Sequence, residues 1–308
     1  MNQATLQTHN LSIGFDSSKI LFEKINLKLN AGELVCFMGP NGIGKSTLIR
    51  TLAGLQKPIS GEVSGRDEKT VAVVLTDRVA ASHMTVSELI TYGRYPYLDW
   101  NISLSEKDSR IISKSIDTVN VRPLLDKKLY ELSDGQMQLV MIARALVQDT
   151  PVLLLDEPTA HLDLNNRLEI MNLLRKLCRE TGKAILIATH ELDLALQTAD
   201  LIWLTTADKS IKTGIPEDLV LDNSMDEVFK FKGFDLRTGK VEHESYRKIK
   251  IKLEGDGPVY LWTRNALERS GFEVDNKSST EVVIKDNQWS FRNQSFTKIE
   301  MLLAALSD

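Results

Sequence analysis

Short apolar runs, each followed by glycines, carboxylates or a histidine, recur along the first two thirds of the chain. The clearest run is residues 34–38 (LVCFM), whose length and side chains predict a buried strand. A glycine-rich stretch follows at 39–44, and apolar residues at helical spacing follow over 46–53. This order predicts a strand, a tight loop and a helix in succession.

The loop carries the complete GxxxxGK[ST] pattern of a phosphate-binding loop (P-loop) as GPNGIGKS. Its glycines allow successive backbone N–H groups to turn toward phosphate oxygens, and the helix N-terminus adds its partial positive charge. Lys45 would reach the β- and γ-phosphates, and the Ser46 hydroxyl would ligate Mg²⁺. An ordinary glycine turn before a helix is the weaker alternative. The residues expected to bind the nucleotide are Gly39, Asn41, Gly42, Gly44, Lys45, Ser46 and Thr47.

Two later apolar runs end in residues suited to phosphate chemistry. Residues 152–155 (VLLL) lead into Asp156 and Glu157, a Walker B pattern. Asp156 would hold the Mg²⁺ shell, and Glu157 would take a proton from the attacking water. Residues 183–189 lead into His190, at the kind of strand end where open α/β sheets bind ligands. We expect His190 to contact the γ-phosphate; the alternative is a purely structural histidine.

Two other regions show clear periodicity. Residues 5–30 alternate between apolar and polar positions, which predicts strands of an antiparallel sheet. Phe15 lies at the end of one such strand, where it either stacks on adenine or belongs to the core. Capping-box patterns at 85–88 (TVSE) and 105–108 (SEKD) predict helix starts. Residues of about 84–150 are therefore expected to be rich in helices.

The stretch LSDGQ at 132–136 precedes the Walker B strand, and TAHLD follows it at 159–163. With these two motifs, the chain closely resembles the ATP-binding subunits of ABC transporters over about residues 5–230. The motifs of that family follow here in its usual order and approximate spacing, namely the P-loop, signature, Walker B, D-loop and switch histidine.

This resemblance implies an α/β P-loop NTPase of ABC type. Its parts are a RecA-like core, an antiparallel β subdomain and a helical subdomain at about 84–150. We assign residues 1–245 to this ATP-binding domain.

In that family two such domains sandwich two ATP molecules, and the signature of one domain faces the P-loop of the other. The resemblance therefore implies a homodimer in which Ser133, Gly135 and Gln136 bind ATP held by the other copy. Asp163 of the D-loop is also expected at the nucleotide. A helix N-terminus facing the γ-phosphate would join the two copies, and hydrolysis would release them.

Residues 85–97 (TVSELITYGRYPY) are similar to a segment of the ATPases that serve importers of iron chelates, haem and cobalamin. The resemblance implies hydrolysis of ATP, with Mg²⁺, that powers import of an iron chelate (siderophore), haem or cobalamin. The partners implied are integral-membrane permease subunits and an external substrate-binding protein. The alternatives are an exporter ATPase and a soluble, non-transport ABC ATPase. The soluble class is less favoured because the chain has one P-loop and no long heptad pattern before the signature.

Two positions depart from the family pattern. Thr76 stands where the family has a glutamine that senses Mg²⁺ and the attacking water, so we expect a metal contact of shorter reach, with Asp77 as a candidate substitute. Asp134 replaces a signature glycine; its carboxylate suits a first helical turn, and we expect it to face away from phosphate. ATP hydrolysis is expected to survive both changes.

The composition bears on the binding partners and the cellular location. The net charge of -4 over 308 residues gives no reason to expect nucleic acid as a partner, and two cysteines fit a reducing compartment. The polar N-terminus lacks the apolar core of a signal peptide, and no apolar stretch approaches the roughly twenty residues that span a bilayer. We therefore expect a peripheral protein at the cytoplasmic face of the bacterial inner membrane.

Beyond residue 229 the motifs stop, and the remaining pattern predicts a small α+β appendage at 246–308. The lysines that alternate with apolar residues in its first strand indicate a solvated sheet face. In order, the pattern predicts a strand at 249–253, a helix at 258–270, strands at 272–274 and 281–284, and a helix at 296–306.

Overall fold

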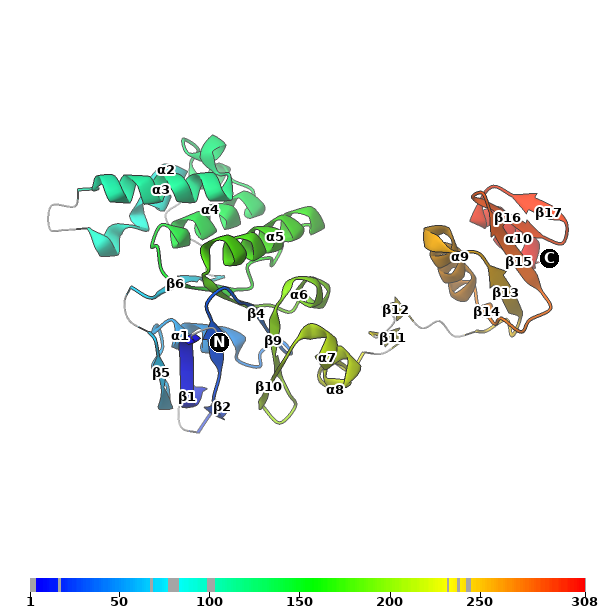
Figure 1. Ribbon diagram of the computed structural model, residues 1–308, viewed down its shortest axis with the longest axis horizontal. Coiled ribbons are helices and arrows are strands. Elements are labelled where there is room, and N and C mark those ends of the chain that lie inside the picture. Colours follow the sequence, from blue (N-terminus) through cyan, green and yellow to red (C-terminus); the bar gives the residue numbers. More distant parts are fainter. Residues whose placement is uncertain are drawn as a thin grey trace. The chain divides into compact units, whose positions relative to one another are not determined.

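A six-stranded sheet is the centre of the first part of the chain. Figure 1 shows the computed structural model. The strands of this sheet lie in the order β10-β9-β4-β8-β7-β6, and all are parallel except β10. The strand bounds are β4 Leu34–Met38, β6 Val71–Val74, β7 Val152–Asp156, β8 Ala184–Ala188, β9 Leu201–Thr205 and β10 Ile211–Gly214.

The chain divides into two compact units, Met1–Lys230 and Phe231–Asp308. The structure describes residues 4–15, 18–66, 69–76, 83–98, 103–231, 233–236, 239–241 and 245–307. Within these ranges, no helix combines the length and apolar character needed to cross a membrane.

The strand order of the large sheet decides which loops become neighbours. β4, β7 and β8 are buried at every position, as expected for parallel strands covered on both faces. Helix α1 (Lys45–Leu52) packs on β7 and β8, and α5 (Leu164–Thr181) packs on β4 and β8. Ala188 of β8 pairs with Phe37 of β4 on one side and with Asp156 of β7 on the other. The loops after these strands therefore begin side by side at one edge.

A second, antiparallel sheet confirms the strands predicted over residues 5–30. Its longest strand, β1, pairs with each of the other three strands. Apolar side chains of this sheet, of α1 and of the large sheet form one buried cluster that includes Leu11, Phe22, Phe37 and Leu48. The strand bounds are β1 Ala4–Gly14, β2 Ile20–Ile25, β3 Lys28–Asn30 and β5 Ser60–Ser64.

Between β6 and β7 the chain forms a group of helices, here called the helical insertion (Figure 1). Both predicted capping boxes are confirmed. Thr85 caps α2 by accepting a hydrogen bond from the Glu88 amide, and Ser105 caps α3 by accepting one from the Asp108 amide. Both helices pack on α4. The elements are α2 Val86–Tyr92, η1 Tyr95–Tyr97, α3 Glu106–Val119, η2 Arg122–Leu124, η3 Leu129–Glu131 and α4 Asp134–Leu146, where η marks a short 3₁₀ turn.

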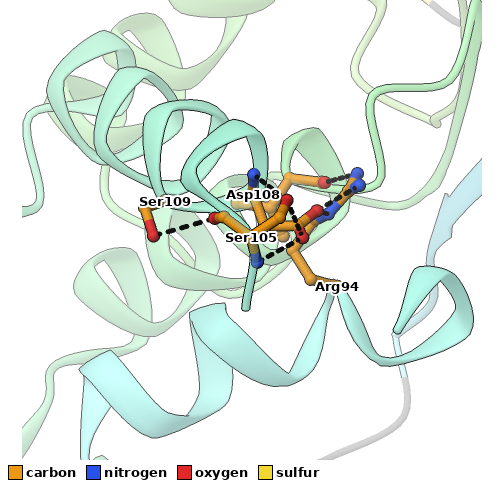
Figure 2. A network of polar contacts seen from close by, with 5 residues as sticks. Arg94, Ser105, Asp108 and Ser109 are labelled. Atoms are coloured by element: carbon orange, nitrogen blue, oxygen red, sulfur yellow. Dashed lines mark hydrogen bonds and ion pairs between the residues drawn. The ribbon is translucent and has the colours of Figure 1, made fainter. Parts of the chain in front are cut away.

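A buried ion pair holds the helical insertion together (Figure 2). The Nε and Nη2 atoms of Arg94 donate to Asp108 Oδ1 at 2.9 and 2.6 Å, and its Nη1 donates to the Val147 carbonyl at 2.9 Å. The other carboxylate oxygen of Asp108 accepts bonds from the Ser105 amide and hydroxyl. Those bonds and the Arg94 guanidinium hold the pKa of Asp108 at about 2. Arg94 therefore links the end of α2, the start of α3 and the end of α4.

Gly93, the residue before Arg94, lies where α2 crosses α4. A Cβ at this position would come within 2.4 Å of the Arg144 carbonyl oxygen and of a Val147 methyl group. The centre of the Tyr97 ring lies 4.2 Å from the Arg94 guanidinium carbon. The segment GRYPY is therefore a structural junction, because its glycine permits the close crossing and its arginine binds three helices.

Short helices complete the first unit: α6 Leu192–Thr198 connects β8 to β9, and α7 Pro216–Leu221 and α8 Ser224–Phe229 follow β10. The second unit holds a two-stranded hairpin and a five-stranded sheet in the order β14-β13-β15-β16-β17. One apolar cluster joins this sheet to α9 and α10, and it includes Ile251, Leu267, Trp289 and Leu302. The bounds are β11 Phe234–Asp235, β12 Lys240–Val241, β13 Lys250–Glu254, α9 Gly257–Arg269, β14 Glu273–Val274, β15 Glu281–Lys285, β16 Gln288–Phe291, β17 Gln294–Phe296 and α10 Ile299–Ser307.

One prediction for the second unit is wrong. Phe296 ends β17, and the terminal helix begins at Ile299. Strands β16 and β17 were not predicted, because each has only three or four residues. The signal was in their turns, where Asn287 and Asn293 adopt positive φ angles of 58° and 66°. Asparagine tolerates this conformation, and paired positive-φ residues are typical of two-residue hairpin turns.

The lysines of β13 lie on a charged sheet face, as predicted. Lys252 Nζ lies 2.7 Å from Glu281 Oε1 of the neighbouring strand β15. Lys250 Nζ lies 3.0 Å from Glu273 and 2.9 Å from Asp275. Exposed pairs of this kind contribute little to stability, so the core on the other face carries most of the folding energy of this unit.

Replacing Arg94 should weaken the first unit far more than replacing an exposed arginine of α3. The Arg94→Met change leaves the Asp108 carboxylate buried without its cation, which costs about 3 kcal/mol, at the lower end for breaking a buried ion pair. The matched control is Arg110→Met, because Arg110 pairs with Glu106 in full exposure and should change stability by less than about 0.5 kcal/mol. Urea denaturation followed by circular dichroism measures both. Equal losses in the two variants would contradict this role of Arg94.

Candidate active site

The loop after β4 has the backbone of a phosphate cradle. Helix α1 begins at Lys45, and its N-cap Gly44 has a φ of 114°. Gly42 has a φ of 76°. Residues that have a Cβ atom rarely adopt these positive φ angles, so glycine is needed for the loop to fold over the N-terminus of α1. The free backbone N–H groups of that first turn then face the loop.

Lys45 lies at the centre of the loop and is only 6% exposed. Its Nζ donates to the carbonyl oxygens of Gly39 at 2.9 Å and of Pro40 at 3.3 Å, and it lies 3.9 Å from Glu157 Oε1. Burial lowers the pKa of Lys45, while the carboxylates of Glu157 and Asp156 act in the opposite direction. The ammonium is thus held by neutral carbonyls that phosphate oxygens could replace.

Glu157 connects the P-loop to the end of β8. Its backbone has a φ of 49°, and its amide donates to the Ala188 carbonyl at 2.8 Å. Its Oε2 lies 2.7 Å from His190 Nδ1. A cation, a carboxylate and an imidazole therefore stand in a row from Lys45 through Glu157 to His190, at the edge where β4, β7 and β8 end.

Asp156 has the properties of a cation ligand. It is 1% exposed, and its Oδ1 has no hydrogen-bond partner among the described residues. Its Oδ2 accepts a bond from the Thr76 hydroxyl at 3.3 Å. A buried carboxylate oxygen without a partner is costly unless a cation satisfies it. The residues present therefore fit a divalent ion beside the P-loop.

A Mg²⁺ ion at this place would share its ligands between the chain, phosphate oxygens and water. In the described part of the chain, no group of three or more His, Cys, Asp or Glu side chains could hold a metal. Mg²⁺ requires six ligands and commonly takes one or two protein oxygens together with phosphate oxygens and water. Asp156 and the Ser46 hydroxyl suit such a shared site.

A cavity of about 400 Å³ opens over the P-loop and collects most of the predicted nucleotide-binding residues. Phe15 lines it and is 67% exposed, so the alternative that Phe15 is a core residue is wrong. Leu21 also lines it and was not predicted. The lining residues are Phe15, Leu21, Asn41, Gly42, Gly44, Lys45, Ser46, Thr47 and Glu157.

The signature lies apart from this cavity. Of the described residues, Ser133, Gly135, Gln136 and Asp163 are absent from its lining. Ser133 is exposed and caps α4 by accepting a hydrogen bond from the Gln136 amide at 3.3 Å. Asp134 is exposed in the first turn of α4. One copy of the chain therefore does not bring its own signature to its own P-loop.

The D-loop and the signature meet through a residue that sequence reasoning missed. Asp163 caps α5, and its two carboxylate oxygens accept bonds from the amide and the side chain of Asn166, each at 2.9 Å. A Cβ on Gly135 would come within 2.9 Å of the Asn166 side chain. The signal was the spacing of Asp163 and Asn166, which matches an N-cap and its third helical residue.

A second cavity, of about 440 Å³, lies between the end of β6, the helical insertion and the D-loop. Thr76, Gln138 and Glu157 supply part of its polar lining, and apolar residues such as Tyr130 and Met141 supply the rest. Glu157 lines both cavities. Asp77, the candidate substitute for a metal-sensing glutamine, lies outside the described residues.

Comparison with known proteins identifies the family. A family model described as ABC transporter matches residues 22–160, and one described as iron ABC transporter C-terminal domain matches residues 248–307. A third, described as an AAA domain of a type IV toxin–antitoxin system, overlaps the first over part of residues 126–196.

An uncharacterized ABC transporter ATP-binding protein of Methanocaldococcus jannaschii is 42% identical over 74% of this chain and 82% of its own length. This chain belongs to the family of ABC transporter ATP-binding proteins. The petrobactin import ATP-binding protein FpuD of Bacillus anthracis is 34% identical over 74% of this chain and 87% of its own. The iron(3+)-hydroxamate import ATP-binding protein FhuC of Bacillus subtilis is 33% identical over 81% of this chain and 98% of its own length. The chain is therefore the ATP-binding, ATP-hydrolysing subunit of an ABC transporter.

Solved structures of ABC transporter proteins are similar to this chain. An inward-facing metal-chelate type ABC transporter matches with a TM-score of 0.68 and 26% identity, over 74% of this ATPase and 90% of that chain. A dimeric bacterial ABC transporter cassette, MJ0796, matches with a TM-score of 0.59 and 26% identity, over 68% of this chain and 98% of that chain. The predicted fold class, an α/β P-loop NTPase of ABC type, is confirmed.

Replacing Gly44 with alanine should impair nucleotide binding. At a φ of 114°, a Cβ is strained and also lies 3.0 Å from the Leu21 side chain, so the cradle must shift. Strain of about 1–2 kcal/mol corresponds to roughly a tenfold loss of ATP affinity. Titration with a fluorescent ATP analogue measures the affinity of the variant and of the wild type. Gly182→Ala is the control, because Gly182 has a φ of 68° at the end of α5 with open space around it, and should leave affinity unchanged. Equal affinities in all three proteins would contradict the role of Gly44.

Proposed function

We propose that this ATPase powers the import of a ferric siderophore through a membrane permease. The observation that carries the proposal is the match of two parts of the chain to iron-related proteins. Residues 248–307 match an iron ABC transporter C-terminal domain, and relatives at 33–34% identity are named for petrobactin and iron(3+)-hydroxamate import. Relatives named for achromobactin and enterobactin transport point to the same class of substrate.

In the proposed reaction, the P-loop holds the phosphates of ATP, and Phe15 stacks on the adenine. The Lys45 ammonium exchanges the carbonyls of Gly39 and Pro40 for oxygens of the β- and γ-phosphates. Asn41, Gly42, Gly44 and Thr47 complete the cradle. Lys45 therefore neutralises charge that develops on the phosphates as the bond breaks.

Glu157 is the proposed general base. It borders the P-loop cavity, and its carboxylate can accept a proton from the attacking water. His190, at 2.7 Å, orients this carboxylate and contacts the γ-phosphate. Ser46 and Asp156 would hold Mg²⁺, which when bound neutralises phosphate charge.

We infer that the working unit is a homodimer. The support is that no described signature residue lines the P-loop cavity, where a second copy would supply them, and that a dimeric ABC transporter cassette is similar to this chain. Ser133, Gly135 and Gln136 of one copy would then cap the ATP of the other, with Asp163 positioning the signature through Asn166. Binding of ATP across the interface would close the dimer, and hydrolysis would open it.

The proposed transport involves subunits besides this ATPase. We propose integral-membrane permease subunits, an external substrate-binding protein and a location at the cytoplasmic face of the bacterial inner membrane. In this proposal residues 1–245 form the ATP-binding domain and 246–308 an accessory domain, whereas the compact units divide between Lys230 and Phe231. Haem and cobalamin remain alternative cargoes, and an exporter ATPase is the alternative for the direction of transport.

Glu157→Gln should separate ATP binding from hydrolysis. An amide of the same size cannot take a proton, so phosphate release should fall by about 10²–10⁴-fold while ATP affinity stays within about twofold. Size-exclusion chromatography with Mg-ATP should then show a lasting dimer. Glu180→Gln, the same change at an exposed position of α5, is the control and should keep full turnover. Unchanged phosphate release in the Glu157 variant would refute its role as base.

The cargo is tested with the permease. Tagged Glu157→Gln protein with Mg-ATP should capture a permease with many spans from detergent-solubilised membranes, and capture of soluble partners alone would favour the non-transport class. Proteoliposomes with the wild-type ATPase, that permease and its binding protein should accumulate a ⁵⁵Fe-labelled ferric hydroxamate or catecholate when ATP is on the ATPase side. Uptake of only haem or cyanocobalamin, or transport in the opposite direction, would overturn the siderophore proposal.

A further inference from the structure

Thr76 touches the carboxylate that is proposed to hold the metal. It follows β6, the neighbour of β7, and the parallel pairing of Val74 with Leu155 brings Thr76 and Asp156 to the same edge of the sheet. The Thr76 hydroxyl donates to Asp156 Oδ2 at 3.3 Å. A hydroxyl has one proton to donate, and here Asp156 receives it.

This contact makes the two oxygens of Asp156 unequal. Oδ2 is bonded to Thr76, whereas Oδ1 is buried and has no hydrogen-bond partner among the described residues. A hydrogen bond to one oxygen restricts rotation of the carboxylate and so fixes the direction of the other. A group that orients a metal ligand in this way typically changes metal affinity by about 10–100-fold when it is removed.

We propose that Thr76 is a positioning residue that acts on the metal through Asp156, in place of the direct metal contact expected from the sequence. Its hydroxyl holds Oδ2, which leaves Oδ1 directed at the cation. This inference rests on the proposed function, because it assumes that Mg²⁺ binds beside the P-loop with the nucleotide. A threonine side chain is long enough for this role, because its hydroxyl already contacts Asp156 Oδ2.

Substitutions at Thr76 should leave the fold intact. The residue is exposed and borders the cavity of about 440 Å³, so its side chain is outside the packed core. Thr76→Val keeps the shape and removes only the hydroxyl, whereas Thr76→Ser keeps the hydroxyl. This pair of variants isolates the hydrogen bond from the effects of side-chain shape.

A double-mutant cycle tests the proposal with Mn²⁺ as the probe. Electron paramagnetic resonance measures Mn²⁺ affinity in the presence of a non-hydrolysable ATP analogue, for Thr76→Val and Thr76→Ser in the wild-type and Asp156→Ala backgrounds. In the wild-type background, Thr76→Val should weaken Mn²⁺ binding about 10–100-fold and Thr76→Ser by less than twofold. In the Asp156→Ala background, Thr76→Val should change the affinity by less than twofold, because the group it acts through is gone.

Each other result overturns the inference. If Thr76→Val weakens Mn²⁺ binding by the same factor in both backgrounds, Thr76 is a direct ligand. If it has no effect in the wild-type background, the hydrogen bond is without consequence. Nucleotide binding without metal, measured in EDTA with a fluorescent ATP analogue, separates this failure from that of the proposed function. A wild-type protein that binds neither nucleotide nor Mn²⁺ with nucleotide would refute the proposed function itself.

Discussion

The parallel pairing of β8 with β4 on one side and β7 on the other is the constraint on which the site depends. It brings together the ends of three strands that lie far apart in the sequence, with Ala188 level with Phe37 and Asp156. The P-loop, the carboxylates and His190 follow those ends. Hydrogen bonds of a buried sheet are rigid, so the row from Lys45 through Glu157 to His190 is positioned by backbone pairing and needs little support from flexible side chains.

The same sheet explains why the site contains buried charge. Parallel strands with both faces covered are apolar, and only their ends can carry polar groups without a large desolvation cost. Lys45 and Asp156 lie at that boundary, each under 7% exposed. Carbonyls and Glu157 compensate Lys45, whereas one oxygen of Asp156 keeps no protein partner among the described residues. A cation bound at Asp156 would remove that imbalance.

The helical insertion carries the signature, whose residues Ser133, Gly135 and Gln136 do not line the P-loop cavity, and buried contacts join its helices. Buried contacts of Arg94 tie α2, α3 and α4 together, and the close crossing at Gly93 brings α2 against α4. Asn166 supports the signature from the D-loop side. The segment that begins with Gly93 and Arg94 is therefore a structural junction of these helices.

The sequence by itself determined the elements whose signals are local. The glycine pattern of the P-loop, the Walker B carboxylates, the capping boxes at Thr85 and Ser105 and the buried strands all depend on residues close together in the chain. Fold class and family followed from their order. Short strands such as β16 and β17 could not be predicted, because three or four residues give too little periodicity.

Tertiary structure decided what depends on distance through space. It placed Phe15 at the surface of the P-loop cavity, and it separated the signature from that cavity. It also gave the Thr76 hydroxyl to Asp156 Oδ2 and joined Asp163 to Gly135 through Asn166. No local pattern records these contacts, because strand order and helix packing bring their partners together only after the chain has folded.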